Sequence, residues 1–309
     1  MSSSHVHPSR QSFDDLYSSI QGNSNIYALF DGASEGAKDF FCDCYDNHKL
    51  EIHSLVIPPF DAPPEELLSM PHLIRFDQDR LLYNHCRSLL GKNAFILVCG
   101  VEDMMTTISM LEKILWVIVP STEKPAWFRF YSPNILNAFL SQATEQHLAT
   151  FFNEILTGYW AEDIPATTED SGQEDYARAV TSLCYYHVEY DQLPAKPDGM
   201  MQLFPEHLDR FEEKRSEYFI VGLCRHIAKQ RIIPDYLWPD MRKQVGLAID
   251  EAAEYGITSY PCLCLYIDAA CRFDWDFALS HPELKTILPH QGLPENVKEE
   301  ILRQALSAK

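Results

Sequence analysis

The chain has few basic residues and lacks any long apolar run, and each shortage argues against a class of function. It carries 25 Lys and Arg against 45 Asp and Glu, a formal net charge of −20. Because nucleic-acid binding needs clustered cations to neutralise phosphates, no nucleic acid is expected as a partner. The longest apolar stretches, such as 94–99 and 114–119, are far shorter than the roughly 20 residues that span a bilayer. No membrane partner is therefore expected.

The sequence also lacks a secretory signal and an ordered cysteine pattern. The first eight residues contain no apolar segment, which predicts a cytoplasmic protein. The nine cysteines are scattered and lie mostly inside apolar runs, where cysteine behaves as a small buried hydrophobe. The pairs Cys42/Cys44 and Cys262/Cys264 have neither the spacing nor the matching second pair of a zinc site. We expect reduced cysteines and no bound metal.

Catalytic motifs are missing as well. The chain has no Gly-x-Ser-x-Gly elbow, no phosphate-binding P-loop, no Gly-x-Gly-x-x-Gly after its first strand and no His-Glu-x-x-His. The turn at 31–36 has two glycines, but Asp31 and Glu35 would repel a phosphate, so Gly32 is interpreted as the residue of a tight turn. We therefore expect no catalytic residue, no cofactor and no enzymatic activity.

The pattern of apolar residues divides the chain into four parts. A polar, serine-rich segment (1–24) precedes an α/β lobe (25–160), in which short apolar runs alternate with helical spacing. An acidic linker and connecting segment (161–204) leads to a smaller, all-helical lobe (205–309). Strands that alternate with helices predict a mainly parallel sheet, with an antiparallel edge formed by a hairpin at 115–131. The run 183–190 is either a last strand or a segment between the lobes.

Two side chains of the α/β lobe leave alternatives open. Asp31 follows a buried strand, where open α/β sheets place ligand-binding groups, but it also suits an ion pair or a helix N-cap. Arg129 lies between Phe128 and Phe130, so its side chain faces away from theirs. It either pairs with an acid such as Asp31 or reaches a partner.

Two strings in this lobe resemble a known family. The string Ile26-Tyr27-Ala28-Leu29-Phe30-Asp31-Gly32-Ala33 looks like the opening strand of the domain of unknown function 4123 family. The string Trp127-Phe128-Arg129-Phe130-Tyr131-Ser132-Pro133 is similar to that family's Phe-Arg-Phe-Tyr-Asp-Pro stretch, with Ser132 in place of Asp as the expected helix cap. The resemblance covers roughly 24–162. The residues that we single out as a structural motif are Tyr27, Asp31, Gly32, Phe128, Arg129, Phe130, Tyr131 and Pro133.

The resemblance implies a binding protein. Members of this family are effector chaperones, or adaptors, of type VI secretion. They hold a toxic effector in the cytoplasm and promote its loading onto the VgrG spike. The implied partners are a cognate effector, the VgrG protein and, as a third candidate, a PAAR-type tip domain. The two strings themselves have the chemistry of a buried strand, a capped helix and packed aromatic rings, so they are not assigned as partner contacts.

The distribution of charge bears on two other candidate functions. Residues 1–204 hold 12 basic and 28 acidic residues, whereas residues 205–309 hold 13 and 17. An acidic first part predicts electrostatic steering of a basic cargo, which weakens with salt. The same charge suits an immunity protein that blocks a basic toxin by charge mimicry. A small-molecule enzyme with its site around Asp31 and Gly100 is the third alternative.

Overall fold

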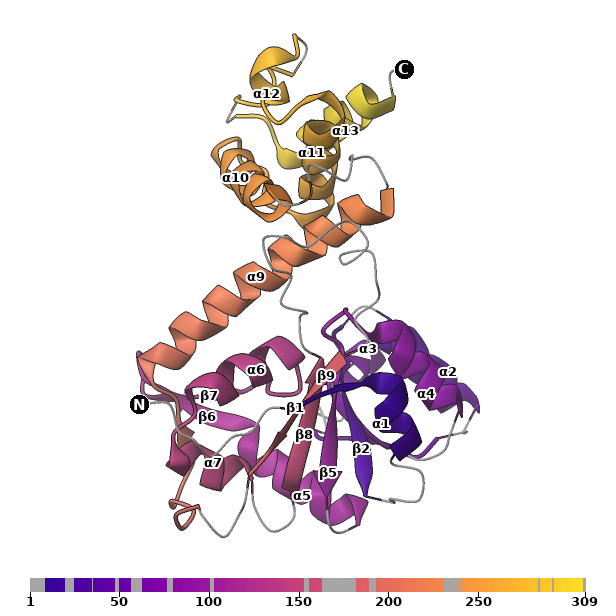
Figure 1. Ribbon diagram of the computed structural model, residues 1–309, viewed down its shortest axis with the longest axis vertical. Coiled ribbons are helices and arrows are strands. Elements are labelled where there is room, and N and C mark those ends of the chain that lie inside the picture. The colour runs from indigo at the N-terminus through magenta and orange to yellow at the C-terminus, as the bar shows by residue number, and fades with distance from the viewer. Residues whose placement is uncertain are drawn as a thin grey trace. The chain divides into compact units, whose positions relative to one another are not determined.

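The computed structural model describes the chain in two compact units. One comprises Met1–Pro165 with Ala179–Arg215, and the other Ala166–Arg178 with Ser216–Lys309 (Figure 1). The described residues are 9–19, 25–34, 36–47, 50–56, 63–76, 80–100, 103–152, 156–162, 182–188, 193–230, 238, 240–282, 284–290 and 292–307. Residues 163–181 of the predicted acidic linker and connecting segment lie outside the described residues.

The first unit is built around a seven-stranded sheet, in which every pair of neighbouring strands is antiparallel. The predicted mainly parallel sheet is therefore wrong. In spatial order the strands are β1 (Ser9–Ser12), β9 (Ser182–His187), β8 (Leu156–Glu162), β5 (Phe95–Gly100), β2 (Ile26–Asp31), β4 (Pro71–Arg75) and β3 (Ile52–Ser54).

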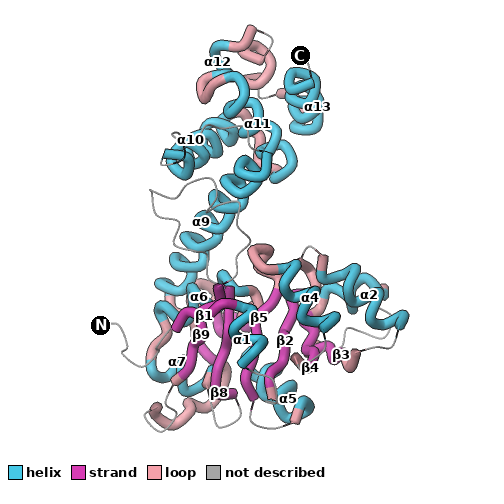
Figure 2. The backbone as a smooth tube through the Cα atoms, turned by 45° about the vertical axis from the view of Figure 1, so that its right-hand side comes forward, coloured by secondary structure: helices cyan, strands magenta, loops and turns pink. Residues whose placement is uncertain are grey.

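The error has a physical cause in the way the helices connect the strands. An unbroken apolar run such as 26–30 indicates burial on both faces of a sheet, but it does not fix the direction of the neighbouring strand. The β2–α2–β3 connection steps over β4, and the β4–α4–β5 connection steps over β2 (Figure 2). Strands joined by these helices are parallel to each other, yet an antiparallel strand separates each pair.

Helices cover both faces of this sheet (Figure 1). Because side chains alternate along a strand, Ala28 and Phe30 of β2 enter one core and Tyr27 and Leu29 enter the other. The first core includes residues of α1 (Phe13–Ser19), α2 (Ala37–Asn47) and α4 (Arg80–Leu89). The second includes residues of α5 (Met104–Ile114), α6 (Pro133–Gln142) and α7 (Glu145–Phe151). Helix α3 (Pro64–Ser69) lies between β3 and β4 in the chain.

The predicted hairpin is present, but it belongs to a separate sheet rather than to an edge of the large one. Strands β6 (Trp116–Val119) and β7 (Lys124–Trp127) pair antiparallel, and β10 (Met201–Gln202) joins β6 in parallel. Strand β7 ends at Trp127, earlier than predicted. Beyond it Phe128 and Phe130 are buried while Arg129 is exposed, so the predicted orientation of Arg129 is confirmed.

Strand β8 is one of three strands that the sequence analysis missed, together with β1, in the expected polar N-terminal segment, and β10. Its residues were divided between the end of the α/β lobe and the acidic linker, yet β8 is buried between β5 and β9. A Cβ at Gly158 would lie 2.5 Å from the Tyr185 ring, so a larger residue here would displace that ring. Of the two alternatives for 183–190, the structure shows a strand, β9.

The described part of the second unit is helical. Helix α9 (Pro205–Gln230) begins in the first unit and continues into the second, where it is followed by α10 (Met241–Glu254), α11 (Tyr260–Phe273), α12 (Phe277–Ser280) and α13 (Glu295–Ser307). Their core includes Leu223, Ile227, Val245, Ile267 and Leu302. Gly256 follows α10 with a φ of 71°, which is the C′ position of a helix that favours glycine. Among the described residues of the chain, no helix has the length and apolar character of a membrane span.

Candidate functional site

An open pocket of about 520 Å³ lies in the first unit. The end of β2, the loop at 91–93, the β6–β7 hairpin, the start of α6 and the first turns of α9 all contribute to its lining. Its residues come from both strings of the family resemblance: Asp31 from the first, and Trp127, Phe128, Arg129 and Ser132 from the second. Side chains far apart in the sequence are thus brought to one place.

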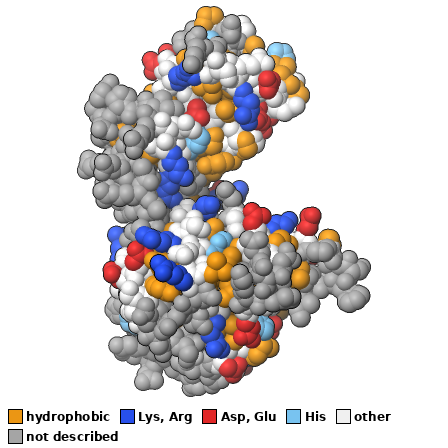
Figure 3. All heavy atoms as spheres, turned by 90° about the vertical axis from the view of Figure 1, so that its right-hand side faces the viewer, with side chains coloured by type: hydrophobic (Ala, Val, Ile, Leu, Met, Phe, Trp, Pro, Cys, Tyr) orange, Lys and Arg blue, Asp and Glu red, His pale blue; other side chains and the backbone are white. Residues whose placement is uncertain are grey.

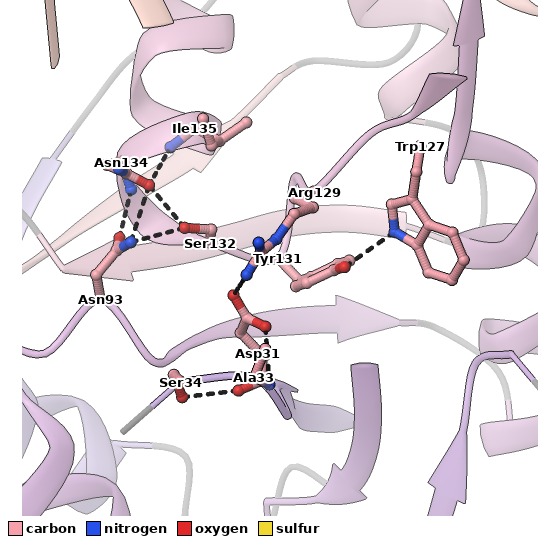
Figure 4. A network of polar contacts seen from close by, with 10 residues as sticks. All are labelled: Asp31, Ala33, Ser34, Asn93, Trp127, Arg129, Tyr131, Ser132, Asn134 and Ile135. Atoms are coloured by element: carbon pink, nitrogen blue, oxygen red, sulfur yellow. Dashed lines mark hydrogen bonds and ion pairs between the residues drawn. The ribbon is translucent and has the colours of Figure 1, made fainter. Parts of the chain in front are cut away.

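Asp31 and Arg129 form an ion pair at the rim of this pocket (Figure 4). An Arg129 Nη2–H donates to Asp31 Oδ2, and the backbone N–H of Ala33 donates to Asp31 Oδ1 at 3.2 Å. Asp31 is 3 % exposed, whereas the Arg129 side chain remains 53 % exposed. Of the alternatives that the sequence left open for the two residues, the structure shows the ion pair.

The electrostatics of the pair raise the pKa of Arg129 itself and that of the neighbouring Tyr131. Burial lowers the pKa of the Arg129 guanidinium, but the Asp31 carboxylate and Tyr131 raise it by more, so its net pKa is above the usual value. Burial, followed by the charge of Asp31, raises the pKa of Tyr131 to about 12. The Tyr131 hydroxyl therefore stays protonated at neutral pH, and it accepts a hydrogen bond of 2.9 Å from Trp127 Nε1.

Gly32 occupies the tight turn that follows Asp31. The Ser34 backbone N–H donates to the Asp31 carbonyl oxygen at 2.9 Å, which closes the turn. A Cβ on Gly32 would lie 2.3 Å from two backbone oxygens, those of Leu68 and Met70. The end of α3 thus approaches Gly32 too closely for any side chain. Glu35, the second acid of this turn, lies outside the described residues.

The aromatic residues of the second string form part of the protein core. The rings of Phe128 and Phe139 have their centroids 5.1 Å apart, and those of Phe130 and Phe151 are 5.3 Å apart. Tyr27 of the first string belongs to the same core. Of these core residues, Phe128 also lines the pocket, as do Asp31 and Arg129 of the ion pair.

Ser132 occupies the N-cap position of α6 and Pro133 opens the helix, as predicted, but the expected cap by the serine side chain is absent. The Ser132 side chain makes no capping hydrogen bond. Instead Asn93 Oδ1 accepts from the Asn134 backbone N–H at 2.8 Å, and Asn93 Nδ2 donates to Ser132 Oγ at 2.7 Å (Figure 4). The capping oxygen therefore comes from a residue distant in the sequence, which the family string could not reveal.

Asn93 and Glu162 are two site residues that the sequence analysis did not identify. Asn93 has a φ of 56°, a left-handed conformation that asparagine tolerates better than most residues. The Glu162 carboxylate accepts from the backbone N–H groups of Gly91, at 2.6 Å, and Asn93. Glu162 is 3 % exposed, so it belongs to the fold rather than to the acidic linker. The Gly-Lys-Asn sequence at 91–93 is a turn signal that could have located this loop.

The residues proposed for an enzymatic alternative are not brought together. The backbone N–H of Asp31 donates to the Ala94 carbonyl, whereas that of Gly100 donates to the Asn25 carbonyl, both at 2.8 Å. Because β2 and β5 are antiparallel, Asp31 and Gly100 lie beside opposite ends of β2. In a parallel sheet, the two residues would have been at the same edge.

Two buried histidines, His147 and His207, pack together where α9 begins within the first unit. His147 Nε2 bonds the Gln202 carbonyl oxygen at 2.7 Å, and the Phe204 backbone N–H donates to His207 Nδ1 at 3.1 Å. The two imidazole rings have their centroids 4.8 Å apart. Burial, together with the nearby His147, lowers the pKa of His207 to about 4. This arrangement places Leu208 and Phe211 in the pocket wall.

Mild acid is expected to destabilise the first unit through His207. The unfolded imidazole titrates near pH 6.5, so it takes up a proton before the folded one does. The stabilisation is complete above pH 6.5 and falls as the pH decreases toward 4. Between pH 6.5 and 5 we expect a loss of about 1–2 kcal/mol from this residue in the free energy of unfolding. Urea unfolding of the wild type and of His207→Gln at several pH values between 5 and 6.5 measures this loss. The free energy of unfolding of the variant should depend less on pH than that of the wild type, and an equal pH dependence would contradict the assignment.

No group of three or more His, Cys, Asp or Glu side chains is arranged to hold a metal ion in the part of the chain that the structure describes. The pocket offers a half-buried ion pair, additional cations and an apolar wall, an arrangement suited to holding another molecule. Comparisons of this chain with models of protein families, with curated proteins and with solved structures found no match.

Proposed function

We propose that the chain is an effector chaperone, or adaptor, of type VI secretion. It binds a cognate effector in the cytoplasm and promotes loading of that effector onto the VgrG spike, with a PAAR-type tip domain as a further candidate contact. The proposal extends the resemblance that the two sequence strings carry.

The observation that carries the proposal is the meeting of both strings at one open pocket. Asp31 and Arg129 are 98 residues apart in the sequence, yet they form the ion pair at its rim. The strings are thus parts of one local structure, which favours the resemblance over a chance similarity of two short segments.

The composition of the pocket supports binding of a protein segment that must later be released. Its apolar wall includes Val117, Leu208 and Phe211, whereas Asn93, Ser132 and Arg129 contribute polar groups. An apolar centre with a polar rim is typical of interfaces between proteins that exist separately. A chaperone that hands over its cargo needs an interface of this kind rather than a large apolar one.

Co-purification tests the proposal. The tagged full chain is co-expressed with the effector and the VgrG protein encoded beside its own gene, and each is assayed for retention on the tag. We expect the effector to be retained, and VgrG to be retained when the effector is present. Retention of neither protein would overturn the proposal. Tight binding to the isolated toxic domain, with protection of the producing cell, would favour an immunity protein instead.

A further inference from the structure

The charge lining the pocket is opposite in sign to that of the whole chain. The chain has a net charge of −20, but the pocket is lined by three cations, Lys92, Arg129 and Arg215, and one carboxylate, Asp31. Acidic, basic and apolar side chains are interspersed on the face of the molecule drawn in Figure 3. Net charge therefore does not dictate the sign of a particular binding site.

The cations of the pocket are only partly neutralised by the protein itself. Asp31 is held by Arg129, so it does not offset the other two. Arg215 lies 3.7 Å from Glu212, but both side chains are more than 70 % exposed, and such surface pairs contribute little. Lys92 is exposed, and it makes no ion pair with any residue that the structure describes. Two positive charges are thus available to a ligand.

The guanidinium of Arg129 adds donors to this rim. It carries five N–H groups in a planar fork, of which the contacts with Asp31 and Tyr131 use only part. Because Asp31 fixes the guanidinium and the Arg129 side chain is half exposed, the remaining N–H groups are held in place beside the pocket. A second carboxylate could bind there without the entropic cost of ordering the arginine.

An apolar wall lies beside these cations. Val117 and Ala126 are register partners in the β6–β7 hairpin, and both line the pocket. The start of α9 adds Leu208 and Phe211, and the Phe211 ring centroid lies 6.2 Å from that of Phe128. The volume of about 520 Å³ is within the usual range for sites that enclose a ligand of modest size.

We propose that this pocket binds a short segment of a partner protein in which a carboxylate lies next to apolar side chains. The apolar side chains of the segment contact the wall formed by Val117 and Phe211. Its carboxylate binds Lys92 and Arg215, or the N–H groups of Arg129 that its contacts within the protein do not use. This inference deepens the proposed function, on which it rests for the identity of the partner. It also replaces the expected basic cargo with an acidic contact at this site.

A peptide-display selection tests the chemistry of the segment without knowledge of the effector. The probe is a random library of 12-residue peptides, selected against the full chain. We expect the selected peptides to combine Asp or Glu with aliphatic or aromatic residues. A double variant, Lys92→Glu with Arg215→Glu, should bind them at least tenfold more weakly, because each reversal repels the carboxylate.

The matched control is Lys113→Glu with Lys124→Glu, which makes the same change of charge in the same unit at two residues that do not line this pocket. Its affinity should equal that of the wild type, and all three proteins should have the same thermal midpoint. Selection of basic peptides, failure to select any peptide, or equal weakening by both double variants would overturn the inference. If the wild type retains the effector while the pocket variant retains it equally well, the inference fails and the proposed function stands.

Discussion

Replacing Gly32 with alanine is expected to lower the free energy of unfolding by about 3 kcal/mol. The new Cβ would lie 2.3 Å from the carbonyl oxygens of Leu68 and Met70. These are backbone atoms, so no change of rotamer relieves the overlap, and either the turn or the end of α3 must move. Because Gly32 follows Asp31 directly, such a shift also displaces the carboxylate from Arg129. Urea unfolding measures the loss of stability.

Gly246 provides the control for this substitution. It lies within α10, and a Cβ at this position would meet no heavy atom within 4 Å beyond the backbone of its own helix. Alanine at this position is expected to stabilise the chain by roughly 0.5–1 kcal/mol, because glycine is a poor helix former. A Gly32→Ala protein as stable as the wild type would show that α3 does not approach the turn as described.

Replacing Arg129 with methionine is expected to cost about 3 kcal/mol of stability, near the lower end for a broken buried ion pair. The substitution keeps an unbranched apolar side chain but leaves the Asp31 carboxylate buried and without its cation. This cost is lower than that of breaking a fully buried ion pair, because the Arg129 side chain is half exposed. Combining it with Asp31→Asn removes the buried charge, so the double variant should be more stable than Arg129→Met alone.

The exposed ion pair between Arg87 and Asp14 provides the comparison. Its N–O distance is 3.4 Å, and both side chains are more than half exposed. Arg87→Met should therefore change the free energy of unfolding by less than about 1 kcal/mol. The variants are compared by urea unfolding. Equal costs for Arg129→Met and Arg87→Met, or no recovery in the double variant, would contradict the structural role of the Asp31–Arg129 pair.

The sequence indicated the elements of this fold better than their arrangement. Apolar runs correctly located β2 and β5, and helical spacing located α10 at its observed bounds. Whether neighbouring strands are parallel or antiparallel depends on whether another strand is inserted between the two that a helix connects. No local sequence pattern encodes this spatial order. For this reason Asp31 and Gly100, which a parallel sheet would bring to one edge, lie beside opposite ends of β2.

The candidate site shows the same limit. Arg129 was singled out because an arginine between two phenylalanines must face away from the core, and Asp31 was named as a partner for it. Asn93 and Glu162 were missed because their role is to satisfy backbone groups of distant segments. The pocket wall could not be predicted either, since Leu208 and Phe211 lie far along the chain from the strands and loops that complete it.

Loading of the effector onto VgrG tests the central proposal most directly. The measurement is the amount of effector that co-sediments with assembled VgrG in cells with the intact gene, in deletion cells, and in deletion cells supplied with the chain. We expect loading to be lost on deletion and restored by the wild-type chain. Restoration by the Lys113→Glu/Lys124→Glu control but not by Lys92→Glu/Arg215→Glu would assign the role to the pocket. Undiminished loading in the deletion cells would contradict the account.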